Sequence, residues 1–165
     1  DAGLSGALFG FDLRTRPEQV YRALIEATAF GARKIIETLE AGGVAVRELY
    51  ACGGIAEKNK LLLRIYADVT GRTLRVARSQ QACALGAAIL GAAVAPPERG
   101  GHAGGILEAA RAMAGAPAET YAPDPAAQPA YHRLYAGYSR LHEHFGRRDD
   151  LLRELKALRL TASGQ

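Results

Sequence analysis

The feature that most constrains the fold is an alternation of strand-like and helical segments in the middle of the chain. In order, these are a strand at 47–52, a helix that Gly71 closes, a strand at 73–77 and a helix at 83–94. Asn59 or Glu57 is predicted to lead into the first of these helices. Short strands that alternate with helices are typical of crossover units, so the pattern predicts an α/β layer. The last helix consists mostly of small residues and is expected to pack closely against the sheet or a neighbouring helix.

A longer helix is predicted before this alternation. Apolar residues recur at three- to four-residue spacing, and the glycine pair at 42–43 ends the pattern after about 25 helical positions. Thr15 is the predicted cap, with Pro17 in the first turn and Glu18 in the capping-box position. Residues 1–13 are expected to be extended, because glycines interrupt any helical pattern there.

A loop rich in proline and glycine, at 96–105, divides the chain into an α/β core over 1–95 and a helical C-terminal part over 106–165. Within the second part, Asp124 and Pro125 are placed to begin a long helix. One face of that helix carries a stripe that is more typical of core packing than of a ligand cage. The members of this stripe are Tyr131, Leu134, Tyr135, Tyr138, Leu141, His142 and Phe145.

Asp149 or Asp150 is predicted to cap a last short helix, LLRELKALR.

Composition excludes several classes of protein. The net charge is only +4 and the basic residues are scattered, so no nucleic-acid partner is expected. The longest apolar run, 82–95, is shorter than the roughly 20 residues that span a bilayer, so no membrane partner is expected either. Cys52 and Cys83 are too few for a disulfide framework and are expected to be buried free thiols in a reducing, cytoplasmic protein. The start at Asp1 predicts a piece of a longer protein.

The strongest local signal for a binding site is the pair Gly53 and Gly54, which follows the first predicted strand. Glycines let a backbone approach a ligand closely, and a helix N-terminus offers free N–H groups to a phosphate. The pair indicates nucleotide binding, but a glycine pair also suffices to turn a strand into a helix. Neither GxGxxG nor GxxxxGK[ST] occurs, so a dinucleotide fingerprint and a P-loop have no support.

Other clusters do not indicate catalysis or metal binding. His142 and His144 are two positions apart, so a helix places their rings on different faces, and no CxxC, HExxH or acidic calcium loop occurs. None of the serines lies in a nucleophile elbow, and the scattered carboxylates are typical of solvated helix faces. We therefore expect no catalytic residue and no metal ligand in this chain.

Three blocks of the sequence resemble the FGGY family of carbohydrate kinases. GALFGFDLRTRPEQVYRALIEA at 6–27 resembles the second signature of that family, and only Phe11 departs, where a smaller aliphatic residue is usual. ACGGIAEKNKLLLRIYADVTGRTLRV at 51–76 resembles the family's adenosine segment, and QACALGAAILGA at 81–92 resembles its ALGAA helix. Further blocks, among them ALIEATAFGARKIIE, YADVTGR and RLYAGYSRLHEHFG, resemble the C-terminal domain of the L-ribulokinase branch.

The resemblance implies an actin-like, ribonuclease H-like ATPase fold, in which two α/β domains close on ATP, Mg²⁺ and a sugar. This chain would be the C-terminal, nucleotide-side domain. The sugar pocket, the first phosphate loop and the catalytic aspartate would belong to an N-terminal domain outside the chain. Gly53 and Gly54 match the glycines that lie against adenosine and the α-phosphate, and Lys58 or Asn59 matches the polar position beside adenine.

The implied activity is transfer of the ATP γ-phosphoryl group to L-ribulose, in L-arabinose catabolism, with this chain inactive alone. Two alternatives stay open: another FGGY kinase, acting on xylulose, glycerol or a similar substrate, and a non-catalytic actin-like binding module. A phosphate loop and a catalytic aspartate encoded upstream would favour the kinases. Apolar surface left where the first domain packs is expected to favour association, including with a second copy.

Overall fold

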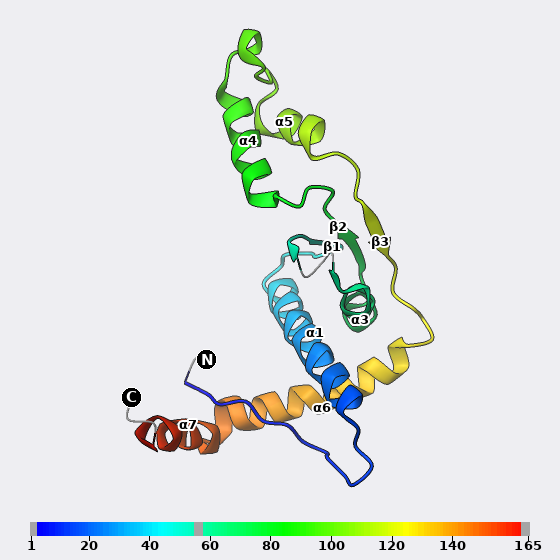
Figure 1. Ribbon diagram of the computed structural model, residues 1–165, viewed down its shortest axis with the longest axis vertical. Coiled ribbons are helices and arrows are strands. Elements are labelled where there is room, and N and C mark those ends of the chain that lie inside the picture. The colour runs from blue at the N-terminus through cyan, green and yellow to red at the C-terminus, as the bar shows by residue number, and fades with distance from the viewer. Residues whose placement is uncertain (1–2, 55–57, 163–165) are drawn as a thin grey trace.

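The computed structural model describes residues 3–54 and 58–162 (Figure 1). Helix α1 (Pro17–Ala41) has 25 residues, as the apolar spacing predicts, but its start differs by one residue. Because the residue before a proline is pushed into extended backbone, Arg16 is the N-cap in place of Thr15. The side-chain oxygen of Gln19, and not that of Glu18, accepts the Arg16 N–H at 2.8 Å.

A sheet of three strands follows in the order β1 (Glu48–Ala51), β2 (Thr73–Val76) and β3 (Glu119–Tyr121). The first two strands are parallel, and β3 pairs antiparallel with β2. The alternation predicted from the sequence is confirmed by the parallel pair, whereas the sequence predicts no strand at the position of β3. Within the described residues, β1 has no strand on its outer edge.

Helix α3 (Lys60–Thr70) makes the crossover between β1 and β2. Of the two predicted lead-in residues, Asn59 is the N-cap, and its side-chain oxygen accepts the Leu62 N–H at 3.0 Å; Glu57 lies outside the described residues. Gly71 ends the helix at φ +66°, a left-handed conformation that glycine adopts without a steric penalty, and its N–H bonds to the Ala67 carbonyl. Both predicted ends of this helix are therefore confirmed.

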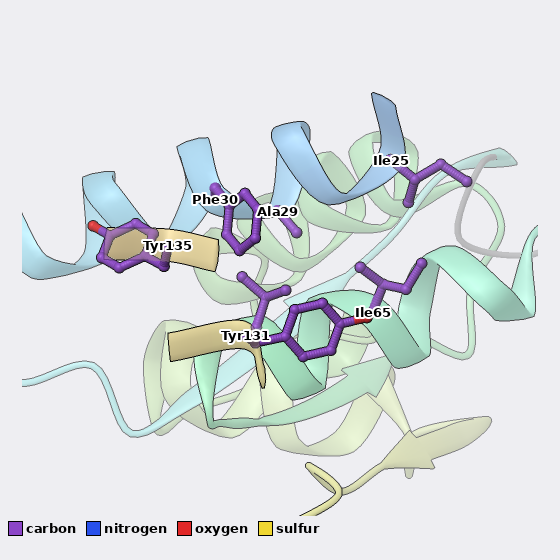
Figure 2. Packing of buried hydrophobic residues seen from close by; sticks show 7 residues of the cluster. Ile25, Ala29, Phe30, Ile65, Tyr131 and Tyr135 are labelled. Carbon is purple, nitrogen blue, oxygen red and sulfur yellow. The ribbon is translucent and has the colours of Figure 1, made fainter. Parts of the chain in front are cut away.

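Hydrophobic residues are buried on two sides of α3. On one side, side chains from α1, α3 and helix α6 (Gln128–Glu143) form a first cluster of buried residues, which Figure 2 shows. On the other side, Leu63 and Ala67 pack against Leu74 and Val76 of β2. Helix α3 is thus the middle layer between the sheet and the α1–α6 pair. The C-terminal part of the chain contributes to the same sheet, through β3, and to the same core, through α6.

Tyr131 and Tyr135 of α6 are buried, which confirms that the tyrosine stripe packs in the core, but Leu134 and Leu141 are exposed. The hydroxyls face carboxylates of α1: Tyr131 bonds to Glu26 and Tyr135 to Glu37. Burial, and then the bond to Glu37, raises the pKa of Tyr135 to about 12.

The predicted start of α6 at Asp124 and Pro125 is wrong. Asp124 instead accepts the Ala126 N–H at 2.9 Å in a preceding turn, and the helix begins at Gln128.

Helices α4 (Ala82–Val94) and α5 (Gly105–Ala114), joined through the 3₁₀ turn η1 (Pro97–Arg99), form a hairpin at one end of the molecule (Figure 1). Small residues let the two helices approach each other, as expected, but none of the α4 residues is buried. Cys83, in the first turn of α4, is therefore exposed, and so is Cys52 just after β1. The expectation of buried thiols is wrong: Cys83 lies on a helix that has no buried residue, and Cys52 lies in the exposed connection after β1.

The C-terminal end carries the π-helix η2 (His144–Arg148) and helix α7 (Leu151–Ala162). Of the two predicted caps, Asp149 accepts the Leu151 N–H at 2.8 Å. The segment before α1 runs along these helices: the Ser5 N–H donates to the Leu152 carbonyl at 3.2 Å, and Phe9 stacks on Phe145 with ring centroids 5.2 Å apart. None of the helices traced in the structure combines the length and the apolar character needed to cross a membrane.

Candidate functional site at the carboxyl ends of the parallel strands

The parallel strands β1 and β2 end at the same edge of the sheet. Ala51 pairs with Val76 at this edge, and the Ala77 N–H donates to the Ala51 carbonyl at 2.9 Å. In open α/β sheets, ligands bind outside the carboxyl ends of the strands, where the connections to the next helices begin. Two such connections start here, one with Cys52, Gly53 and Gly54 and the other with residues 77–81.

Gly53 and Gly54 leave the space above their backbone open. Gly53 has φ +87°, which side-chain-bearing residues rarely adopt, and Gly54 is exposed. A Cβ atom built on either residue would meet no other atom within 4 Å. The structure therefore leaves room for a ligand beside the main chain of both glycines, while the positive φ of Gly53 also suits a turn from strand to helix.

Lys58 and Asn59 bound this segment on its other side, directly before α3. Lys58 is exposed, and Asn59 is half-buried. The Asn59 carbonyl oxygen is used as the helix cap, and its amide nitrogen donates to the hydroxyl of Tyr21 on α1 at 3.4 Å. The structure thus brings Gly53, Gly54, Lys58 and Asn59 into one connection, and it adds Tyr21, for which the sequence carries no local signal.

A groove of about 470 Å³ opens beside the same strands. It lies between Tyr50 of β1, residues 77–79 after β2, and the α4–α5 hairpin. Most of the residues that line it are alanine, leucine, isoleucine and glycine, with the cations Arg78 and Arg111 among the others. Sequence reasoning did not find this groove; the run of small residues in α4 is the signal that could have found it.

An ion pair sits between the start of α3 and the neighbouring strand β3. The Lys60 ammonium lies 3.0 Å from the Glu119 carboxylate, which also accepts a hydrogen bond from the Tyr121 hydroxyl. These bonds lower the pKa of Glu119, chiefly through Tyr121 and then through Lys60, and raise the pKa of both partners. The Lys60 charge is therefore already partnered by Glu119.

The residues that the structure describes do not fit a metal centre. Within 3–54 and 58–162, no group of three or more His, Cys, Asp or Glu side chains is placed to hold a metal ion.

Comparison with known proteins identifies the family. Residues 1–95 match the model of the C-terminal domain of the FGGY family of carbohydrate kinases. The chain belongs to this family. The expected fold is confirmed as well: a xylulose kinase from Rhodospirillum rubrum superposes on 86% of the chain with a TM-score of 0.69 at 27% identity. Another xylulose kinase, from Lactobacillus acidophilus, gives a TM-score of 0.72 at 19% identity, a similarity that supports the fold alone.

The sequence relatives include ribulokinases. The chain is 48% identical to a ribulokinase of Anoxybacillus flavithermus and 49% identical to a ribulokinase of Geobacillus thermodenitrificans, each over 98% of its length. It spans 29% of those two proteins and 28% of the Rhodospirillum rubrum kinase. The chain therefore corresponds to less than a third of the relatives it matches.

Proposed function

We propose that this FGGY domain is the nucleotide-side, C-terminal domain of a longer kinase that transfers the γ-phosphoryl group of ATP to L-ribulose, giving L-ribulose 5-phosphate. The observation that carries the substrate is the 48–49% identity to ribulokinases over 98% of the chain. The neighbours with solved structures include xylulose kinases, but at 27% identity or less. We expect the protein to act in the cytoplasm.

Within that kinase, the connection after β1 would face ATP. Gly53 and Gly54 offer main-chain N–H groups beside open space, which suits a close approach by the adenosine and α-phosphate portion of the nucleotide. Asn59 offers its amide N–H, and Lys58 an exposed cation. The apolar groove along α4 and α5 has a size and lining that suit an aromatic base.

This domain would bind and orient ATP without moving a proton. Phosphoryl transfer is accelerated mainly by positioning and by electrostatic stabilisation, and a bound Mg²⁺ would supply part of that stabilisation. The part of the chain that the structure describes holds no metal cluster, and the sequence indicates no catalytic base. We assign the metal ligands, the catalytic base and the sugar pocket to an N-terminal domain of the longer kinase.

The direct test is ADP release by the full-length protein with ATP, Mg²⁺ and a panel of L-ribulose, D-xylulose and glycerol. We expect kcat/KM to be highest for L-ribulose. A preference for xylulose or glycerol would change the proposed substrate, but the proposed kinase activity would stand. Absence of turnover with every sugar, together with a missing upstream phosphate loop and aspartate, would favour the non-catalytic module.

A further inference from the structure

The side chain of Asn59 is fixed at both ends. Its Oδ1 accepts the Leu62 N–H at 3.0 Å, and only a carbonyl oxygen can accept there, so the orientation of the amide is set. Its Nδ2 then points to the Tyr21 hydroxyl at 3.4 Å. One of the two amide N–H donors is directed at Tyr21, and the other is left for a further acceptor.

The packing and hydrogen bonds of the fold do little to explain a tyrosine at position 21. It lies in the second turn of α1, and its side chain is 56% exposed. Its bond to Asn59 spans 38 positions of sequence and is long for a hydrogen bond, so it contributes little to folding. Bonds of this kind often tighten when a ligand binds, because the ligand orders the groups that make them.

We propose that Tyr21 is a positioning residue for the nucleotide, acting through Asn59. The hydroxyl oxygen accepts one Asn59 N–H and thereby aims the other at an acceptor atom of the nucleoside, a ring nitrogen or a ribose oxygen. Oδ1 faces the first turn of α3, where it accepts the Leu62 N–H, so the end of the amide beside Tyr21 is the donor end. This inference rests on the proposed function, because it takes the ligand of the connection after β1 to be ATP.

The test compares Tyr21→Phe with the unchanged full-length protein in two assays: steady-state kinetics and titration with ADP by calorimetry. Without the Tyr21 hydroxyl the Asn59 amide is no longer aimed at the ligand, and loss of the one neutral hydrogen bond that Asn59 makes to it is expected to raise the Kd for ADP and the KM for ATP about fivefold. The KM for the sugar, kcat at saturating ATP and the melting temperature should stay unchanged. Tyr138→Phe on α6 is the matched control, because it removes a tyrosine hydroxyl outside the site.

A second variant separates positioning from folding. Asn59→Ser keeps a side-chain oxygen that can cap α3 but removes the amide donors. If Tyr21 acts through Asn59, Tyr21→Phe should have no added effect on the Kd for ADP in the Asn59→Ser background. Additive losses would overturn the proposal, and so would an unchanged Kd in Tyr21→Phe alone.

The outcomes also separate this inference from the proposed function. If Tyr21→Phe is silent while wild-type protein binds ADP and turns over sugar, only the role of Tyr21 fails. If Tyr21→Phe is silent but Tyr21→Leu weakens ADP binding, the ring acts by contact and the role of the hydroxyl is refuted. If the wild-type protein itself neither binds ADP nor releases it, the proposed function is refuted, independently of Tyr21.

Discussion

Replacement of Gly54 by valine distinguishes a glycine that contacts a nucleotide from one that only permits a turn. Gly54 does not have a positive φ, and a Cβ there would meet nothing within 4 Å, so the free energy of unfolding should change by no more than about 0.5 kcal/mol. In the nucleotide complex, by contrast, the isopropyl group would occupy the space between the main chain and the ligand. Loss of one charge-assisted hydrogen bond, about 1.5–3 kcal/mol, corresponds to a rise of roughly 10- to 150-fold in the KM for ATP.

The assay is steady-state ADP release by the full-length protein, with ATP and sugar varied in turn, beside a thermal melt. Gly137→Val on α6 is the matched control, because a Cβ there also meets open space but lies away from the carboxyl edge of the sheet. We expect Gly54→Val to raise the KM for ATP and leave the KM for the sugar unchanged. An equal rise in both, or no rise in either, would show that the glycine pair only turns the chain.

Other predictions concern stability and isolated activity. Leu63→Ala should lower the free energy of unfolding by about 3 kcal/mol in urea titrations, because Leu63 is 1% exposed between α3 and the sheet. Gly71→Ala should cost about 1 kcal/mol in the same titration, since alanine is strained at φ +66°. Because the pKa of Tyr135 is raised in the folded protein to about 12, its contribution to stability is complete below pH 10 and is lost as the pH rises to 12; unfolding of Tyr135→Phe should lack that part of the pH dependence. The isolated chain should release no ADP in a sugar-dependent way, and turnover by it would contradict the assignment of the base to another domain.

Local patterns account for the part of the fold that the sequence predicts. The length of α1, the two parallel strands and both ends of α3 depend on apolar spacing, on Asn59 as a cap and on Gly71 as a left-handed stop. Each of these signals acts within a few residues, so each can be read along the chain. The glycine pair could be placed at the end of a strand for the same reason.

The features that the sequence missed depend on distant neighbours. β3 is three residues long and exists because β2 offers it a partner. The exposure of Cys83 follows from α4 packing mainly against α5, with none of its residues buried, which the alanine content of α4 cannot show. The contact between Tyr21 and Asn59 needs α1 to pack on α3, and the groove needs the α4–α5 hairpin to lie over the ends of the strands.

The stretch before α1 is expected to loosen before the core of the domain does. Its bonds from Ser5 to Leu152 join positions 147 residues apart, so they can form only after α1 and α6 have docked and brought those regions together. Contacts that form last and bury little are also the first to be released in local opening. The amide of Ser5 should therefore exchange with deuterium through a small, independent fluctuation, whereas Leu63 should exchange only when α3 leaves the sheet. We therefore expect this region to open and close while the carboxyl edge of the sheet stays folded.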